Sequence, residues 1–150
     1  MSPSNLIDAR GPRFAATITT LILASALLTQ SVWLLLAQTV VFAIGAGLGP
    51  HRSPYGLLFR KLVKARLAPP TEFEDVKPPQ FAQLVGLHFG VVALIGAVLD
   101  VPVIFAGALS AALAAAFLNS VFGYCLGCEM YLLIKHVLHD SNPIRAFVAR

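Results

Sequence analysis

The chain has 150 residues, of which 57% are hydrophobic and only 12% charged. A soluble domain of this size usually carries about a quarter charged residues, so the composition predicts a single integral membrane domain over residues 1–150. The net charge of +4 comes from cationic residues that flank apolar runs, as membrane-anchoring charges do, so nucleic acid is not expected as a partner.

The first apolar segment runs from Phe14 to Leu48. A transmembrane helix needs about 20 apolar residues, so this segment is too long for one span and predicts two, broken at the polar stretch 29–31. The small residues Ala24 and Ala26 have the spacing of a signal-peptidase site. A second apolar run follows at once, however, and we expect the first run to be retained as a span.

The loop 49–79 is predicted to contain a helix of its own. Ser53 suits the position before the helix and Pro54 the first helical position. The stretch up to Leu67 then sets apolar residues against basic ones: Leu58, Phe59, Leu62 and Val63 against Arg60, Lys61 and Lys64. This pattern is typical of an amphipathic helix on the inner membrane surface, and the Pro-rich stretch that follows it is typical of an extended connector. The residues expected to face anionic lipid are Arg60, Lys61 and Lys64.

The second half of the chain predicts two further spans. Phe81 to Val98 has the length of one span, and the fourth begins at about Pro102. The apolar stretch continues to Ile134, which is too long for one helix, so we expect a break near Ser120 or Gly123. The chain is therefore predicted to have four transmembrane helices.

Charge asymmetry predicts the orientation of these spans. With four spans, the N-terminus, the central loop and the C-terminus share one side, and the opposite turns carry only Asp100. Because positively charged loops stay in the cytoplasm, we expect a multi-pass protein of the plasma (inner) membrane with both termini cytoplasmic. All eleven Lys and Arg residues fall on that side: Arg10, Arg13, Arg52, Arg60, Lys61, Lys64, Arg66, Lys77, Lys135, Arg145 and Arg150.

An offset of 67 residues aligns parts of the two halves, about 12–67 with 79–134. It matches "PRFA" with "PQFA" and "SPYG" with "SVFG". This predicts an internal repeat: an all-α membrane fold of two repeated helical hairpins, each followed by a cytoplasmic interfacial helix. The second such helix would cover 121–134 and would place Cys125 in its first turn.

Cys125 and Cys128 are the only cysteines and form a CxxC pair. Cysteines three apart on a helix share a face, and the start of a helix stabilises a thiolate. Cytosolic thiol systems would keep such a pair reduced at rest. The alternative is that both are small packing residues of a non-catalytic scaffold.

Metal and cofactor sites are weaker alternatives. Cys125, Cys128, His136 and His139 form C-x2-C-x7-H-x2-H, a zinc ligand set, although a continuous helix would hold the pairs apart. His88 is the one ionisable side chain inside a span, which makes it a candidate proton relay, haem ligand or quinone contact; otherwise it would hydrogen-bond, for example to Asn119. No cofactor is predicted, and zinc and haem stay as alternatives.

Five stretches carry a family resemblance: "IDARGPRFAA", "SPYGLLFRKLV", "PPTEFED", "PPQFAQLVG" and "FLNSVFGYCLGCEMYLL". With them the chain resembles, from about Ile7 to Leu133, the bacterial membrane family known as domain of unknown function 4395. The resemblance implies a plasma-membrane protein of actinobacteria whose relatives often appear beside thioredoxin-like or sulfurtransferase partners. It implies no defined activity.

These observations favour one function and leave two open. The first is a cytoplasm-facing dithiol that exchanges electrons or sulfur with a thioredoxin-like or rhodanese-like protein, with Cys125 attacking and Cys128 resolving. The second is a non-catalytic scaffold, as a homo-oligomer or a subunit of a larger membrane complex. The third is a metal-binding membrane protein. Whether the chain is an enzyme is left open.

Overall fold

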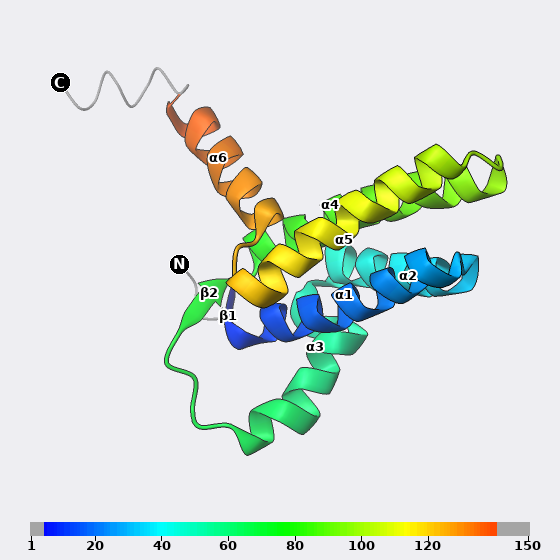
Figure 1. Ribbon diagram of the computed structural model, residues 1–150. Coiled ribbons are helices and arrows are strands. Elements are labelled where there is room, and N and C mark those ends of the chain that lie inside the picture. The colour runs from blue at the N-terminus through cyan, green and yellow to red at the C-terminus, as the bar shows by residue number, and fades with distance from the viewer. Residues whose placement is uncertain (1–4, 141–150) are drawn as a thin grey trace.

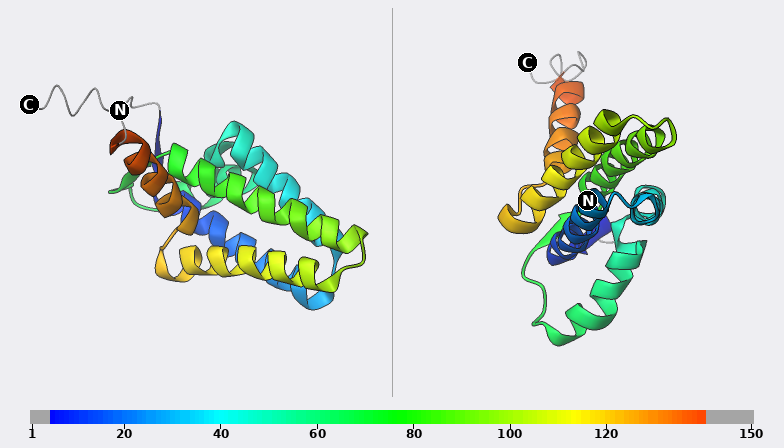
Figure 2. Two further views of the ribbon diagram at one scale, coloured as in Figure 1. Left: turned by 90° about the horizontal axis from the view of Figure 1, so that it is seen from above. Right: turned by 45° about the vertical axis from the view of Figure 1, so that its right-hand side comes forward.

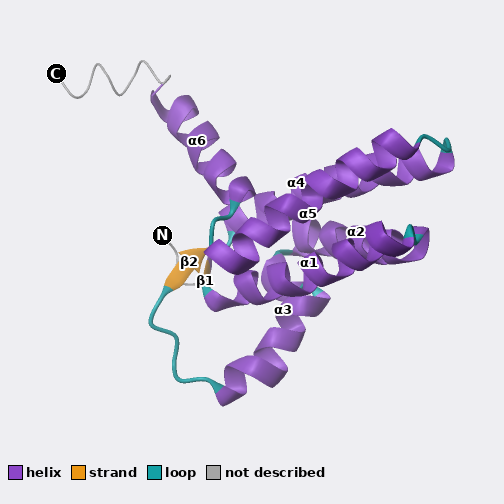
Figure 3. Cartoon of the chain, in the orientation of Figure 1, coloured by secondary structure: helices purple, strands orange, loops and turns teal. Residues whose placement is uncertain are grey.

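The computed structural model of the chain describes residues 5–140 and is mostly helical (Figure 3). Four long helices form a bundle as two successive pairs, each joined by a short turn (Figure 1). α2 packs against α4 and α1 against α5, so the two pairs lie side by side. A further helix, α6, projects from the end of the bundle and packs on α4 (Figure 2). The bounds are α1 (Arg10–Thr29), α2 (Val32–Leu48), α4 (Lys77–Val98), α5 (Pro102–Phe122) and α6 (Leu126–Asp140).

Local signals end and start these helices where the sequence predicts. Gln30 adopts a left-handed conformation (φ 51°) and ends α1, and the hydroxyl of Ser31 accepts a hydrogen bond from the N–H of Leu34 to cap α2. α5 begins at Pro102 and ends at Phe122, just before Gly123, whose φ is 68°. The predicted break at 29–31, the predicted start at Pro102 and the predicted break near Gly123 are therefore confirmed.

The outer surface of the bundle suits lipid. Within residues 5–140, the helices α1, α4 and α5 are long and apolar enough to cross a membrane, whereas α2 has 17 residues and is shorter. Large apolar side chains are exposed on this surface, including Leu28 at 85%, Val98 at 81% and Val103 at 81%. Apolar surface of this extent indicates a membrane or an interface. The chain is thus a helical protein with three candidate spans.

Small residues let the helices approach closely. A Cβ added to Gly86 would lie 2.8 Å from the ring of Phe42, and one added to Gly90 would lie 2.6 Å from Oγ1 of Thr39. These two glycines of α4 therefore bring it against α2, in the manner of small-residue motifs in membrane helices. The buried core around them includes Leu23, Leu35, Ala93, Phe105, Leu109 and Ala112.

A two-stranded ribbon departs from the all-helical expectation. β1 (Leu6–Asp8) pairs antiparallel with β2 (Phe73–Asp75), which lies inside the predicted connector. The carboxylate of Asp8 accepts a hydrogen bond from the guanidinium of Arg10 at 2.9 Å and holds the start of α1 beside the ribbon. The two strands are far apart in the sequence, so no local pattern predicts their pairing.

The predicted surface helix over 54–67 is irregular. After a short turn at Pro50–Arg52 come α3 (Pro54–Leu58), a π-helical turn η3 (Phe59–Val63) and a 3₁₀ turn η4 (Lys64–Arg66). The predicted cap is confirmed, because the hydroxyl of Ser53 accepts a hydrogen bond from the N–H of Gly56 at 3.2 Å. Phe59 is buried and its ring packs on Phe14, with centroids 5.6 Å apart. The basic residues expected at the lipid surface are all exposed: Arg60, Lys61 and Lys64.

The second surface helix begins later than the repeat predicts. α6 starts at Leu126, and Val121 belongs to α5. One offset does not hold through both halves, because α1 and α4 start 67 residues apart, whereas the left-handed turn residues Gln30 and Asp100 are 70 apart. The internal repeat remains a prediction, and its use to place the helix start was wrong by five residues.

Candidate functional site

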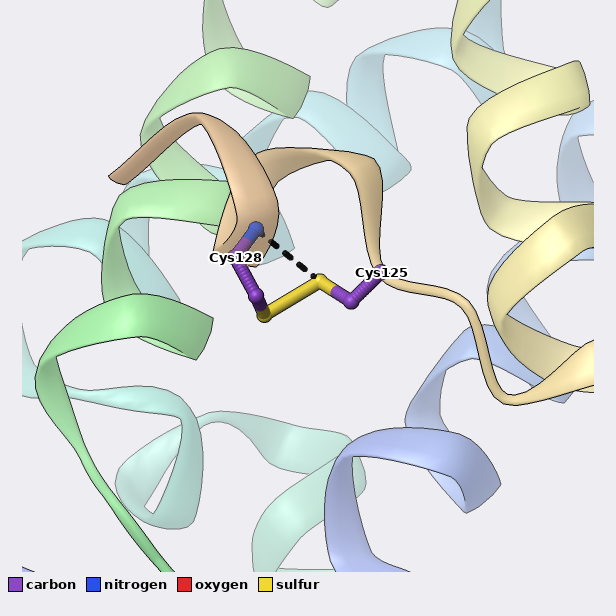
Figure 4. The surroundings of a disulfide bond; sticks show 2 residues. All are labelled: Cys125 and Cys128. Atoms are coloured by element: carbon purple, nitrogen blue, oxygen red, sulfur yellow. Dashed lines mark hydrogen bonds between the residues drawn. A yellow bond between two sulfur atoms is a disulfide. The ribbon is translucent and has the colours of Figure 1, made fainter. Parts of the chain in front are cut away.

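Cys125 and Cys128 lie at the junction of α5 and α6, at disulfide-bonding distance and with their Cα atoms 5.2 Å apart (Figure 4). Cys125 immediately precedes α6, so it occupies the capping position and not the first turn as predicted. Its carbonyl oxygen accepts a hydrogen bond from the N–H of Glu129 at 3.0 Å. Its Sγ accepts one from the N–H of Cys128 at 3.3 Å. The first N–H groups of a helix have no partner within the helix, and here one of them donates to the sulfur.

The chain reverses direction just before the cysteine pair. Gly123 adopts a left-handed conformation and its N–H donates to the carbonyl of Asn119 at 3.1 Å, which closes the end of α5. The side chain of Arg13 lies against this turn, with Nε 3.5 Å from the position of a Cβ on Gly123. A cation from α1 therefore lies beside Gly123, which precedes Cys125 by two residues in the sequence. In the sequence Arg13 is visible only as a topology signal, because no local pattern links α1 to this turn.

Close contact with α4 fixes the start of α6. A Cβ on Gly127, which lies between the two cysteines, would be 2.6 Å from both Cα and Cβ of Ala82. One turn further on, the rings of Phe81 and Tyr131 pack with centroids 5.8 Å apart. Only glycine fits at this approach, so Gly127 sets the position of the cysteine pair on the bundle. The role of Gly127 was not predicted, although a glycine inside the CxxC was the available signal in the sequence.

A cavity of about 330 Å³ lies between α1, α4, α5 and the start of α6. Cys125 and Gly127 line it at the end where α6 begins. The rest of its wall is mostly apolar and small, from residues that include Ala16, Ala82, Gly86, Ala112, Ala115 and Ala116. Phe42 of α2 and the polar Thr19 of α1 also line it. One cysteine of the pair therefore borders an apolar space inside the bundle.

The structure does not bring His88 and Asn119 together. His88 is exposed on α4, where its ring lies 6.0 Å from that of Phe89. Asn119 lines the cavity instead. In the part of the chain that the structure describes, no hydrogen bond joins the two, so the expected pairing was wrong. The cause is the rotation of α4, which points Gly86 and Gly90 at α2 and leaves His88 on the outer surface.

The two histidines near the C-terminus stay on the same helix as Cys128. α6 is continuous from Leu126 to Asp140, so the turn that would fold His136 and His139 back onto the cysteines is absent. Among residues 5–140 no group of three or more His, Cys, Asp or Glu side chains lies close enough to hold a metal ion. The zinc alternative therefore has no assembled ligand set within that range.

A buried polar chain links the bundle to the surface segment. Gln38 of α2 is 1% exposed; its amide donates to the hydroxyl of Thr19 at 3.3 Å and accepts from the hydroxyl of Tyr55 at 2.6 Å. Burial raises the pKa of Tyr55, so its hydroxyl stays a donor to higher pH than an exposed tyrosine. The role of Gln38 was not predicted, although a lone amide in the middle of an apolar helix was a usable signal in the sequence.

The ribbon carries an acid with an unusual titration. Glu74 of β2 pairs with Ile7 in the ribbon, and burial raises its pKa to about 7. In an unfolded chain the same group titrates near 4.5. Because the folded state binds the proton more tightly, Glu74 contributes stability that is present below pH 4.5 and lost as the pH rises through 7.

We expect Glu74→Gln to remove much of this pH dependence. Burial lowers the pKa of His51, which makes the protein less stable as the pH falls below 6.5, but that contribution is the same in both proteins. The difference in Tm between variant and wild type, measured in detergent, should therefore grow in favour of the variant between pH 5 and pH 8. Glu72→Gln, at an exposed position of the same segment, is the control. An unchanged difference across this range would show that Glu74 is hydrated in solution.

Together, a helical bundle with apolar exposed faces, three candidate spans and a CxxC at a helix start define a small helical membrane protein. The chain belongs to the family described as domain of unknown function (DUF4395), whose profile matches residues 7–136. The match covers the bundle, the cysteine pair and the ribbon except Leu6. Comparisons with curated proteins and with solved structures found no match.

Proposed function

We propose that this protein is a four-span plasma-membrane thiol exchanger with its dithiol at the cytoplasmic surface. The observation that carries the proposal is the placement of Cys125 at the start of α6, where its Sγ accepts the N–H of Cys128 and the two sulfurs lie at bonding distance. Both cysteines are partly exposed, so a soluble partner can reach them.

The environment of Cys125 favours it as the attacking thiolate. The N-terminal end of a helix carries partial positive charge, and the N–H of Cys128 is directed at the sulfur. The guanidinium of Arg13 near the preceding turn adds a full positive charge. Cys128 lies one turn along the helix, at a distance suited to resolving a mixed disulfide.

The exchange balances without further components. The Cys125 thiolate attacks a disulfide of a thioredoxin-like partner, forming a mixed disulfide and releasing one partner thiolate. The Cys128 thiolate then attacks the Cys125 sulfur, which releases the second partner thiolate and leaves the Cys125–Cys128 disulfide. Each step is reversible, so a reduced thioredoxin-like partner returns the disulfide to the dithiol by the opposite sequence and becomes oxidised itself. A rhodanese-like partner would instead transfer the outer sulfur of its persulfide to Cys125. The partner class rests on the family resemblance.

The surface segment supplies the membrane contact in this proposal. Arg60, Lys61 and Lys64 are exposed beside apolar side chains such as Leu62, which suits a segment lying on anionic lipid. The central loop and the cysteine junction lie at one end of the bundle, and the two helix turns lie at the other (Figure 1). The excess of cations at the loop end favours the cytoplasm for that end.

Trapping a mixed disulfide between Cys125 and its partner tests the proposal. In cells, Cys128→Ser should accumulate a disulfide-linked adduct of Cys125 with a soluble thiol protein, because the resolving thiol is absent. Cys125→Ser is the matched variant and should form at least about tenfold less adduct, a ratio that corresponds to about 1.4 kcal/mol. The measurement is a reductant-sensitive mass shift on gels, followed by identification of the attached protein. Two thiols that resist alkylation both with and without reductant would contradict the proposal.

A further inference from the structure

We propose that the cavity beside Cys125 binds a lipid-soluble quinone, which accepts two electrons from the dithiol. The inference rests on the proposed function, because it needs Cys125 and Cys128 to cycle between dithiol and disulfide. It adds the class of molecule that would reoxidise them and the place where it would bind.

The size and walls of the cavity fit an apolar ring. Its volume of about 330 Å³ lies in the range of small-molecule sites, roughly 300–1,000 Å³. Protein interiors are otherwise closely packed, with few voids larger than a water molecule. Here small side chains such as Ala112, Ala115 and Ala116 leave the space open, and Phe89 supplies an aromatic surface.

Two side-chain amides are among the residues that line the cavity. Gln83 of α4 and Asn119 of α5 line it, and within residues 5–140 neither side-chain amide takes part in a hydrogen bond. An amide N–H₂ is a donor that fits a carbonyl oxygen. Cys125 lines the same space. A ligand that satisfies the site is therefore apolar, carries carbonyl oxygens and accepts electrons beside a sulfur, which describes a quinone.

The exposed residues of the cavity wall indicate that the ligand enters from the lipid. Ala111 and Met130 line the cavity and are also exposed, so the space reaches the outer surface of the protein. Ala111 belongs to α5, a helix long and apolar enough to span the membrane. A ligand that enters past this helix arrives from the bilayer and not from water.

The reaction balances with this oxidant. The two thiols of Cys125 and Cys128 lose two protons and two electrons, and one S–S bond forms. The quinone takes up both electrons and both protons at its two carbonyl oxygens and leaves as a hydroquinone. No metal and no further co-reactant is needed.

The experiment uses the full chain in lipid nanodiscs, reduced and kept free of oxygen. The probe is a short-chain benzoquinone whose ring carbons are all substituted, so that a thiolate does not add to the ring. Disulfide formation is followed by the loss of alkylation at Cys125 and Cys128, and hydroquinone by its absorbance. We expect a rate that saturates with quinone concentration and one hydroquinone per disulfide. A rate that rises linearly, as for a small dithiol in solution, would overturn the site.

Two substitutions on α5 locate the site. Ala115→Phe fills the cavity and should lower the rate at subsaturating quinone at least about tenfold, or about 1.4 kcal/mol. Ala114→Phe changes an exposed position of the same helix and should leave this rate within about twofold of the wild-type rate. Asn119→Leu keeps the shape but removes the donor, and should raise the half-saturating concentration about fivefold, as for one hydrogen bond. Equal effects of both alanine variants would refute the location.

The outcome separates this inference from the proposed function. If wild-type protein exchanges with a thioredoxin-like partner but its oxidation by quinone does not saturate, the cavity inference fails and the thiol exchanger stands. If the protein neither exchanges thiols with the partner nor is oxidised by quinone, both the proposed function and the cavity inference are wrong. Unchanged Tm values for Ala115→Phe and Asn119→Leu would show that the lost rate is not caused by unfolding.

Discussion

Replacing Gly127 with valine is expected to abolish most thiol exchange while the bundle stays folded. A Cβ at this position would lie 2.6 Å from Cα and Cβ of Ala82, and the first of these is a backbone atom that cannot rotate away. The start of α6 must therefore move off α4. Overpacking of this kind costs about 1–3 kcal/mol, which opposes the packing of α6 on α4 at its first turn. The cysteines would move with it.

The measurement is the rate of reduction by a thioredoxin-like protein, which should fall at least about tenfold for Gly127→Val. Gly107→Val is the matched control, because this helical glycine of α5 has nothing within 4 Å of an added Cβ. The control should exchange at the wild-type rate. Protease sensitivity of α6 should rise in Gly127→Val alone. A Gly127→Val protein that exchanges normally would show that docking on α4 does not position the dithiol.

Helix boundaries were predictable because their signals are local. Ser53 with Pro54 starts a helix through a side-chain cap and a fixed φ, and Gly123 ends one because it adopts a left-handed conformation without strain. The break at 29–31 follows from polar residues between two apolar runs. Each of these signals depends on a few neighbouring residues and is visible in the sequence.

What the sequence missed depends on packing between distant segments. The pairing of Ile7 with Glu74 and the contact of Gly127 with Ala82 each join residues far apart in the chain. The assumption of a constant offset between halves placed Cys125 inside α6, whereas the longer α5 moves the helix start to Leu126. His88 is an ionisable residue inside an apolar helix, which made it a functional candidate, but only the rotation of α4 shows that it faces outward. The cysteine pair itself was predictable from spacing alone.

Membrane topology should follow four spans, with the two turns on one side and the surface segment on the other. α2 has 17 residues, which at 1.5 Å per residue is about 26 Å, slightly short of a hydrocarbon core of about 30 Å. It lies against α4, a helix of 22 residues, and this contact places its ends near those of a full span. Slight thinning of the bilayer makes up such a mismatch at small cost.

Single cysteines on a background without Cys125 and Cys128 decide the topology. Thr29→Cys and Leu99→Cys mark the two turns, and Lys61→Cys marks the surface segment; all three positions are exposed. With four spans, a membrane-impermeant maleimide should label both turns in intact cells and Lys61→Cys only after lysis. If α2 does not cross the membrane, the two turns lie on opposite sides of it, and the maleimide labels only one of them in intact cells.

The same labelling decides the chemistry available to the dithiol. With four spans the end of α5 faces the cytoplasm, where thioredoxin-like reductants keep thiols reduced and an oxidant such as a quinone must form the disulfide. With three spans and the N-terminus inside, α6 would face the oxidising exterior, and the disulfide would be its resting state. Labelling of Thr29→Cys and Leu99→Cys from opposite sides would therefore contradict both the four-span fold and the cytoplasmic partner.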